Sequence, residues 1–259
     1  MTLFIQASHA KDKKRWILQT ISIIITIVAV LAVFVLGIRA YEFAGTTSER
    51  VRQTLVKAHS PYTQLNNISP YIQEAAISSQ DERFYSNSGI DLKGTTRALF
   101  YTFVYGQRQG ASTITEQLAK NVYFQDIDSL KTDGETKALA LFITIRYSKK
   151  TILELYLNEV IYGPKARGIG KASEIYFGVV PDQLTLAQAA YLVGLLNAPG
   201  YFADHPDGAV REAKIVLGTM ERDRYITPSQ QSAAEAELDS FHLLNSLSTD
   251  TKRTHAASN

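Results

Sequence analysis

Two stretches of the chain carry side chains whose types and spacing suit chemistry. Residues 75–91 run from an apolar segment into a polar turn that bears carboxylates. Residues 110–121 run from a loop of small residues into a helical pattern that Ser112 or Thr113 can cap. A helix N-terminus offers free N–H groups, and Lys120 follows one or two turns later. This second stretch therefore suits a phosphate or pyrophosphate group.

The second stretch also has a plainer interpretation. Glu116, Gln117, Lys120 and Asn121 recur at intervals that place them on one polar stripe of a helix. A capped helix with a solvated stripe is the commoner meaning of such a pattern. Spacing alone therefore leaves both interpretations open.

Other site chemistries find no support in the sequence. The five histidines are far apart and match no zinc-ligand spacing. The phosphate-binding loop Gly-x-x-x-x-Gly-Lys-Ser/Thr does not occur, and Gly168 and Gly170 follow no predicted strand. The chain has 27 Lys and Arg against 25 Asp and Glu, and no cysteine. We therefore expect no nucleic-acid partner, no disulfide and no thiol chemistry.

The elements that must position these residues are helices. Amphipathic helical periodicity recurs along the chain, and sustained strand alternation is hard to find. Residues 138–145 and 187–196 are apolar on more than one face, so we expect them at the centre of one core. Helices are predicted at 47–56, 70–79, 93–105, 113–124, 135–147, 149–162, 185–196, 209–224 and 228–238, with loops at 86–89, 106–110, 163–170 and 197–206.

The N-terminal region has the pattern of a membrane anchor. Residues 17–38 are predominantly apolar and carry no charge, and as a helix they would extend about 33 Å, enough to cross a bilayer core. A cleavable signal peptide is the alternative, but its apolar region is usually shorter. Residues 1–15 carry four basic residues against one acidic residue, which places the N-terminus in the cytoplasm.

Five segments, in order, resemble the peptidoglycan glycosyltransferases of family 51, which comprise monofunctional transglycosylases and the glycosyltransferase domains of penicillin-binding proteins. They lie at 75–91, 110–121, 152–158, 168–178 and 184–199, and the resemblance extends from about residue 68 to residue 227. It implies a mainly α, lysozyme-like domain with a membrane-associated apolar subdomain, behind one N-terminal transmembrane helix. Residues 100–105 are candidates for the subdomain, with ordinary core as the alternative.

The implied layout has five parts. These are a cytoplasmic basic tail at 1–15, a transmembrane helix at 16–38, a juxtamembrane linker and helix at 39–66, a glycosyltransferase-like domain at 67–240 and a disordered tail at 241–259. We expect a single-pass protein of the bacterial cell membrane, with its main domain outside the cytoplasm.

The resemblance also implies a reaction, the polymerisation of lipid II. The GlcNAc 4-hydroxyl of one lipid-linked unit attacks the anomeric carbon of a growing chain, and undecaprenyl pyrophosphate leaves. A carboxylate must accept the hydroxyl proton, and cationic or amide donors must stabilise the leaving group. Whether a divalent cation, Mg or Mn, binds at the pyrophosphate is left open. The implied substrate contacts are Phe84, Arg108, Gly110, Ser112, Thr113, Gln117, Lys120 and Asn121.

The chain departs from the family at its catalytic carboxylates. Gln80 stands at the general-base position, and losing that base costs about 3–5 kcal/mol of barrier because an amide cannot accept the proton. Thr136 stands at the position of the second carboxylate. Asp81 and Glu116 are possible substitutes. Asp81 is turned about 100° from residue 80 on a helix, whereas Glu116 lies in a segment that faces the same cleft in the family.

Further departures occur in separate segments. The family's Arg-Lys pair is not recognisable, and counting back without gaps from Ser148 places Thr132 and Asp133 there. Asn87 replaces a histidine, and Gln188 stands where glutamate is usual. Several such changes point to natural divergence.

Three functions remain open at this point. The first is a glycosyltransferase that extends glycan strands from lipid II. The second is a pseudoenzyme that binds lipid II, a glycan strand or another cell wall synthase. The third is a membrane-tethered helical domain with no ligand, against which the retention of Ser112, Thr113, Gln117, Lys120 and Asn121 argues.

Overall fold

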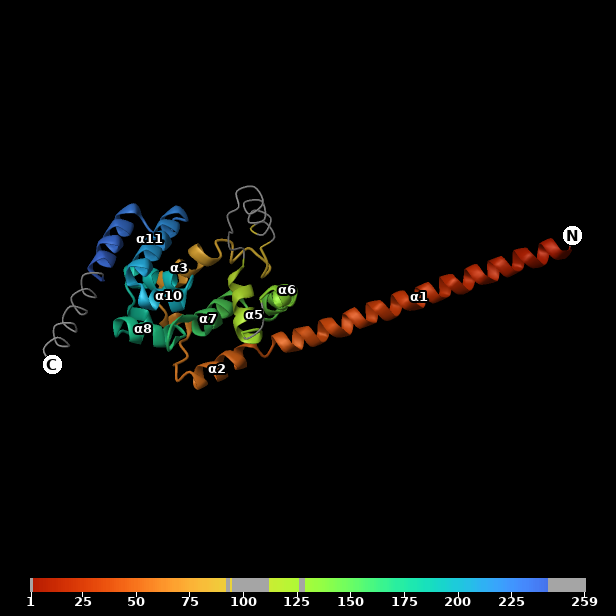
Figure 1. The fold of residues 1–259 in the computed structure, drawn as a ribbon, viewed down its shortest axis with the longest axis horizontal. Coiled ribbons are helices and arrows are strands. Elements are labelled where there is room, and N and C mark those ends of the chain that lie inside the picture. The colour runs from red at the N-terminus through yellow and green to blue at the C-terminus, as the bar shows by residue number, and fades with distance from the viewer. Residues whose placement is uncertain (1, 92–93, 95–111, 126–128, 242–259) are drawn as a thin grey trace. The chain divides into compact units, whose positions relative to one another are not determined.

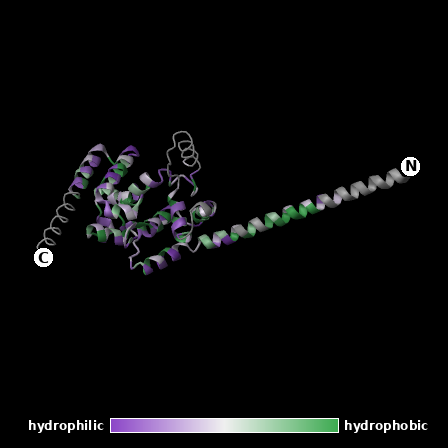
Figure 2. Ribbon diagram, viewed as in Figure 1, coloured by the Kyte–Doolittle hydropathy of each residue, from purple (hydrophilic) through white to green (hydrophobic). Residues whose placement is uncertain are grey.

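The computed structural model describes residues 2–91, 94, 112–125 and 129–241, which form two compact units, Met1–Ala44 and Gly45–Asn259 (Figure 1). The first unit is one helix, α1 (Thr2–Ala44). Hydrophobic residues occupy much of its described length (Figure 2). Among the described residues, no helix combines the length and the apolarity needed to cross a membrane.

The second unit is mainly helical, as the sequence predicts. A further helix occupies residues 228–241. Single 3-10 turns lie at Leu65–Asn67 and Pro181–Gln183. The α-helices are α2 (Thr47–Lys57), α3 (Pro70–Gln80), α5 (Ile114–Tyr123), α6 (Ser129–Arg146), α7 (Lys149–Glu159), α8 (Ile169–Phe177), α9 (Leu186–Leu195), α10 (Pro199–Asp204) and α11 (Pro206–Arg222).

A short β-hairpin replaces the end of the helix predicted at 149–162. α7 ends at Glu159, and β1 (Ile161–Gly163) then pairs antiparallel with β2 (Ala166–Arg167). Pro164 disfavours helical backbone at the residue before it, and the β-branched side chains just upstream favour an extended chain. The helix prediction was wrong here because it followed apolar spacing past these local signals.

The loops predicted at 163–170 and 197–206 were also wrong in part. α8 begins at Ile169, after Gly168 in a positive-φ conformation (φ 75°), and α10 occupies most of the second range. α10 and α11 both begin at a proline, which suits the first position of a helix. Prolines that were interpreted as loop residues therefore open helices. The helix predicted at 93–105 and the loop at 106–110, with the apolar candidates 100–105, lie outside the described residues.

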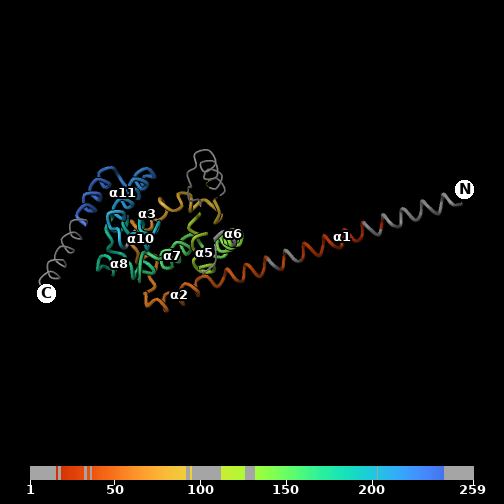
Figure 3. Tube along the Cα trace, in the orientation of Figure 1, coloured from red at the N-terminus to blue at the C-terminus, as the bar shows by residue number. Residues whose placement is uncertain are grey.

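The core forms where α3, α9 and α11 pack together (Figure 3). α9 is buried along nearly its whole length, which confirms the prediction for 187–196. α6 is buried on one face only, since Leu139, Ala140 and Ile143 are buried while Ile145 is 69% exposed. The prediction that 138–145 lies at the centre of the core was therefore wrong. α7 is buried along most of its length and packs against α2, α5, α6 and α8.

Candidate active site

A cavity of about 780 Å³ brings together residues from α3, α5 and α6 and the two residues that follow α9. The two stretches singled out in the sequence, and Thr136 as well, thus contribute to one cavity. Its lining is Ser79, Gln80, Ser112, Glu116, Gln117, Lys120, Thr132, Asp133, Thr136, Leu196 and Asn197.

One threonine joins the two stretches. Thr113 precedes α5 with an extended backbone, and its Oγ1 accepts a hydrogen bond from the N–H of Glu116 at 3.0 Å. The same hydroxyl donates to the carbonyl oxygen of Gly89 at 2.6 Å. Gly89 has φ 95°, and a Cβ there would lie 2.6 Å from the carbonyl oxygen of Ala140. Only glycine therefore lets this turn lie against α6 and hold the cap of α5.

Gln80 is fixed by hydrogen bonds. Its Oε1 accepts from Nε2 of Gln117 at 3.2 Å, and its Nε2 donates to Oγ of Ser79 at 3.2 Å. Gln117 Oε1 in turn accepts from the hydroxyl of the fully buried Tyr156 at 3.0 Å. The residue at the position that the family resemblance implies for the general base is therefore an amide whose oxygen already accepts a hydrogen bond.

Glu116 is the carboxylate of this cavity that is buried. The residue is 4% exposed, and its Oε1 is buried without a hydrogen-bond partner among the described residues. Burial raises the pKa of Glu116 to about 7, and the negative charges of Asp133 and Asp81 act in the same direction. The charge of Lys137 opposes them. A carboxyl group with a pKa near 7 can accept or donate a proton at neutral pH.

α6 contributes uncharged side chains where the family resemblance implies charged ones. Thr132 and Thr136 are both buried and line the cavity. Glu135, one residue from Thr136, is exposed and is not part of the lining. Asp133 also lines the cavity and forms an ion pair with Lys137. α6 therefore places no unpaired basic side chain in the described lining.

The carboxylate of Asp81 is occupied by hydrogen bonds within the protein. Its two carboxylate oxygens accept from Nδ2 of Asn87 at 2.9 and 3.0 Å, and Oδ2 also accepts from the N–H of Ile114 at 3.2 Å. Lys149 donates to Oδ1 of Asn87 at 2.8 Å. Burial raises the pKa of Asp81, while these hydrogen bonds and the charge of Lys149 oppose the rise. Asp81 is absent from the cavity lining and ties the end of α3 to the start of α5.

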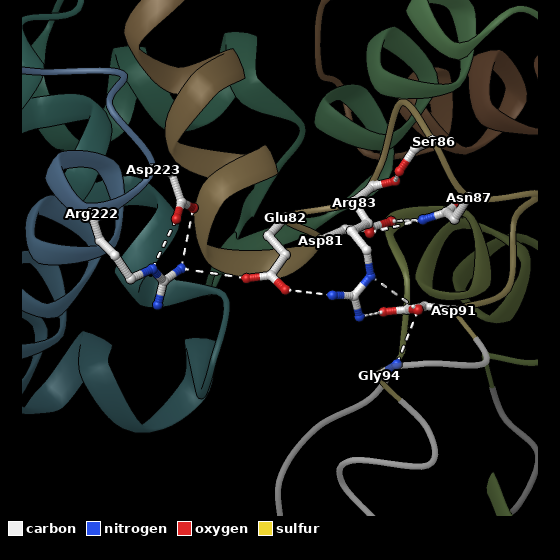
Figure 4. Close-up of polar contacts among 9 residues, drawn as sticks. All are labelled: Asp81, Glu82, Arg83, Ser86, Asn87, Asp91, Gly94, Arg222 and Asp223. Carbon is white, nitrogen blue, oxygen red and sulfur yellow. Dashed lines mark hydrogen bonds and ion pairs between the residues drawn. The ribbon is translucent and has the colours of Figure 1, made fainter.

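A chain of charges continues from this turn to α11 (Figure 4). Arg83 pairs with Asp91 and with Glu82, and Glu82 also faces Arg222 at 3.7 Å. Arg222 contacts Asp223 at 2.8 Å. Asp223 accepts a hydrogen bond from Ser78 of α3 at 2.8 Å. One end of the network therefore contacts α3 at Ser78, two residues before Gln80.

Three further predicted residues, Phe84, Thr113 and Asn121, are described and are absent from the cavity lining. Phe84 is fully buried, with the ammonium group of Lys149 4.7 Å from its ring centre. Thr113 caps α5, and Asn121 is half-buried outside the lining. Arg108 and Gly110 lie outside the described residues.

The lining also contains residues that the sequence did not single out. Ser79 adjoins the base position, and Leu196 and Asn197 follow α9. Their positions inside the segments 75–91 and 184–199, which resemble the family, were the only available signal. Across the described part of the chain, no group of three or more Asp, Glu or His side chains is arranged to hold a metal ion.

Comparison with known proteins gives one consistent family. Residues 47–221 match the family model described as Transglycosylase. Over 195 residues the chain is 35% identical to a monofunctional glycosyltransferase of Staphylococcus haemolyticus, and the match covers 72% of both proteins. Over 199 residues it is 38% identical to penicillin-binding protein 1A of Escherichia coli, covering 75% of this chain and 23% of that protein. The chain belongs to the transglycosylase family, the peptidoglycan glycosyltransferases of family 51.

Proposed function

We propose that the protein is a membrane-anchored peptidoglycan glycosyltransferase that polymerises glycan strands from lipid II in the cavity between α3, α5 and α6. The observation that supports an active site is the carboxyl group of Glu116. It is buried in the lining, its Oε1 has no partner among the described residues, and its pKa is about 7. Glu116 thus offers the proton acceptor that Gln80 does not.

In this proposal Glu116 takes the proton of the acceptor's 4-hydroxyl as the oxygen attacks the anomeric carbon of the donor. The bond from that carbon to the pyrophosphate breaks, and undecaprenyl pyrophosphate leaves. Lys120 is exposed and lines the cavity, and in this proposal its ammonium group contacts the leaving group. Gln80 and Gln117 present amide groups that can orient a sugar.

Membrane anchoring is part of the same proposal. Its support is the uncharged run 17–38 behind a basic N-terminus. Apolar side chains of α1 such as Ile25 and Phe34 are 63% and 64% exposed, which a lipid environment would cover. With the N-terminus in the cytoplasm, the second unit would lie outside it, beside its lipid-linked substrate.

A second candidate function is a pseudoenzyme that binds lipid II, a glycan strand or a synthase partner without turnover. The observation that favours it is the loss of both carboxylates at the positions implied by the family. Gln80 is held by Gln117 and Ser79, and Thr136 faces the cavity with no charge.

Polymerisation of labelled lipid II by the full-length protein in detergent separates the two candidates. For the enzyme, we expect glycan strands from the unaltered protein and a loss of about 10²-fold or more in Glu116→Gln. Glu135→Gln removes an exposed carboxyl group of α6 outside the lining, and its rate should equal that of the unaltered protein.

If the unaltered protein makes no product but still binds lipid II, the pseudoenzyme becomes the proposed function in place of the enzyme. Repeating the assay with EDTA, Mg²⁺ and Mn²⁺ tests the divalent cation. We expect added cation to raise the rate, because the described lining offers a single basic residue, Lys120, to a diphosphate.

A further inference from the structure

A buried tyrosine connects the core of the protein to the cavity through hydrogen bonds. Tyr156 of α7 is fully buried, and its hydroxyl donates to Oε1 of Gln117 on α5 at 3.0 Å. Nε2 of Gln117 donates to Oε1 of Gln80 at 3.2 Å, and Nε2 of Gln80 donates to Oγ of Ser79 at 3.2 Å. We call these four residues the amide chain, because each member donates to the next. Gln117, Gln80 and Ser79 line the cavity, whereas Tyr156 does not.

The two amides do not by themselves fix the direction of the amide chain. A side-chain amide carries its donor and its acceptor at nearly equivalent positions, so turning over both amides together would reverse every bond. In the reversed chain Ser79 would donate to Gln80, Gln80 to Gln117, and Gln117 to the oxygen of Tyr156. Gln80 and Gln117 are equally satisfied in both directions. The two ends of the chain must therefore decide between them.

The Tyr156 end favours the observed direction. Within the described part of the chain, Gln117 is the one hydrogen-bond partner of the Tyr156 hydroxyl. In the reversed chain the hydroxyl proton would be buried without an acceptor, which disfavours that direction by about tenfold or more. Burial raises the pKa of Tyr156, and the negative charge of Asp81 acts in the same direction. The hydroxyl therefore stays protonated and remains a donor at neutral pH.

Tyr156 is itself held in place from both sides along α7. The two carboxylate oxygens of Glu154 accept from the hydroxyl and N–H groups of the segment 62–65. The side chain of Asn158 exchanges two hydrogen bonds of 2.8 Å with the backbone of Thr63. Glu154 and Asn158 lie two residues before and two residues after Tyr156. The tyrosine hydroxyl is therefore a fixed point for the flexible amide of Gln117.

We propose that Tyr156 is a positioning residue that sets the direction of the amide chain. In that direction Gln117 presents an N–H group to position 80, and Ser79 keeps its own proton for an oxygen atom in the cavity. Tyr156 acts from the core through Gln117 and touches no substrate. The proposal deepens the proposed function and rests on it for the role of the cavity in the reaction.

The direction is measurable by placing a titrating group at position 80. In Gln80→Glu the new carboxylate accepts from Nε2 of Gln117, which stabilises its charged form. Adding Tyr156→Phe keeps the ring and removes the hydroxyl, so Gln117 can turn its oxygen toward the protonated carboxyl group. We expect the acid dissociation constant of the carboxyl group at position 80 to fall about tenfold.

The measurement is a ¹³C NMR titration of the full-length protein in detergent, with glutamate labelled at its side-chain carboxyl carbon. The signal from position 80 is identified by its absence from the protein that retains Gln80. Asp81 and Glu116 also titrate near this position, but both are present in every protein compared, so their contributions cancel.

Tyr162→Phe in the same background is the matched control. Tyr162 is also fully buried, and its hydroxyl donates to the backbone carbonyl oxygen of Leu157 at 3.4 Å, outside the amide chain. It should leave the titration at position 80 unchanged. Gln117→Leu is a second variant that does not depend on the folding of Tyr156→Phe. It removes the donor itself, so the dissociation constant should fall at least as far.

Three results would overturn the proposal. They are equal titrations with and without the Tyr156 hydroxyl, an equal shift in Tyr162→Phe, and no shift in Gln117→Leu. The titration requires no turnover. Failure of the proposed function is therefore a separate result, namely absence of glycan product from lipid II.

Discussion

At the scale of single residues, one amide and one carboxyl group decide the chemistry of this cavity. Gln80 stands where the family resemblance implies the general base, but its oxygen already accepts a hydrogen bond from Gln117. Glu116 has the opposite character, because it is a carboxyl group that lacks a partner among the described residues. In the described cavity the buried carboxyl group therefore lies in the first turn of α5, whereas the end of α3 carries an amide.

Gln80→Glu should raise the rate of lipid II polymerisation by about 10²-fold, because it restores a proton acceptor at the base position. A carboxylate oxygen there can still accept from Nε2 of Gln117, so the change fits the existing geometry. Gln188→Glu is the matched control, since Gln188 belongs to the capping box of α9 and is outside the cavity lining. An unchanged rate in Gln80→Glu would mean that the charge changes at 132, 133 and 136 already limit the reaction.

Glu116 should make stability depend on pH. Its pKa is about 7 in the folded protein and near the ordinary 4.5 in the unfolded chain. The folded state therefore binds more protons between about pH 4.5 and 7, and the free energy of unfolding falls as pH rises through that window. Glu116→Gln should remove this pH-dependent loss of stability, which is about 3 kcal/mol over the whole window.

Thermal unfolding at pH 5 and at pH 8 measures this effect. The variant should gain in Tm relative to the unaltered protein as pH rises. Glu159, whose pKa burial also raises to about 7, is present in both proteins, so its contribution cancels in the comparison. Parallel pH profiles would contradict a buried, titrating Glu116.

At the scale of elements, the cavity depends on how α5 is joined to α3 and α6. Asp81 accepts from the first N–H of α5, and Thr113 spans from the start of α5 to Gly89. Lys149 at the start of α7 holds Asn87 in the same turn. Three helices thus converge on one turn, and a small shift there would move Glu116 and Gln80 relative to each other.

Thr113→Val should destabilise the protein by about 1–2 kcal/mol, because the cap of α5 and the bond to Gly89 are both lost. Polymerisation should fall as well, since Glu116 lies in the first turn of α5. Thr185→Val removes the cap of α9 and is the matched control. Urea unfolding should show a similar loss of stability in both variants, and the rate should fall only in Thr113→Val. An equal fall in rate for both would make the effect one of stability alone.

At the scale of the whole molecule, the chain separates into an N-terminal helix and a compact helical unit. Removal of residues 1–44 should move the protein from the membrane fraction to the soluble fraction of lysed cells, because the apolar run lies in that part. The remaining unit should keep its helical circular dichroism and unfold cooperatively, since its core is made by α3, α7, α9 and α11. Continued sedimentation of the shortened protein with membranes would show that another part of the chain binds them.

The sequence by itself determined the family, the mainly helical class, and the fact that two polar stretches contribute to one site. Motif spacing and helical periodicity carry that information, because both are local along the chain. The same local view missed the hairpin after α7 and the helices opened by Pro199 and Pro206. These elements are indicated by single residues in the sequence, and an analysis of helical periodicity does not take single residues into account.

Only the tertiary structure decided what each polar residue does. Asp81 and Glu116 are both acidic, and the sequence offers both as substitutes for the base, yet Asp81 is bonded into a turn while Glu116 lines the cavity. Thr136 lines the cavity and the neighbouring Glu135 is exposed to solvent. The physical reason is that burial and hydrogen-bond partners come from segments far apart in the chain, and these set both the direction of a side chain and the pKa of its carboxyl group.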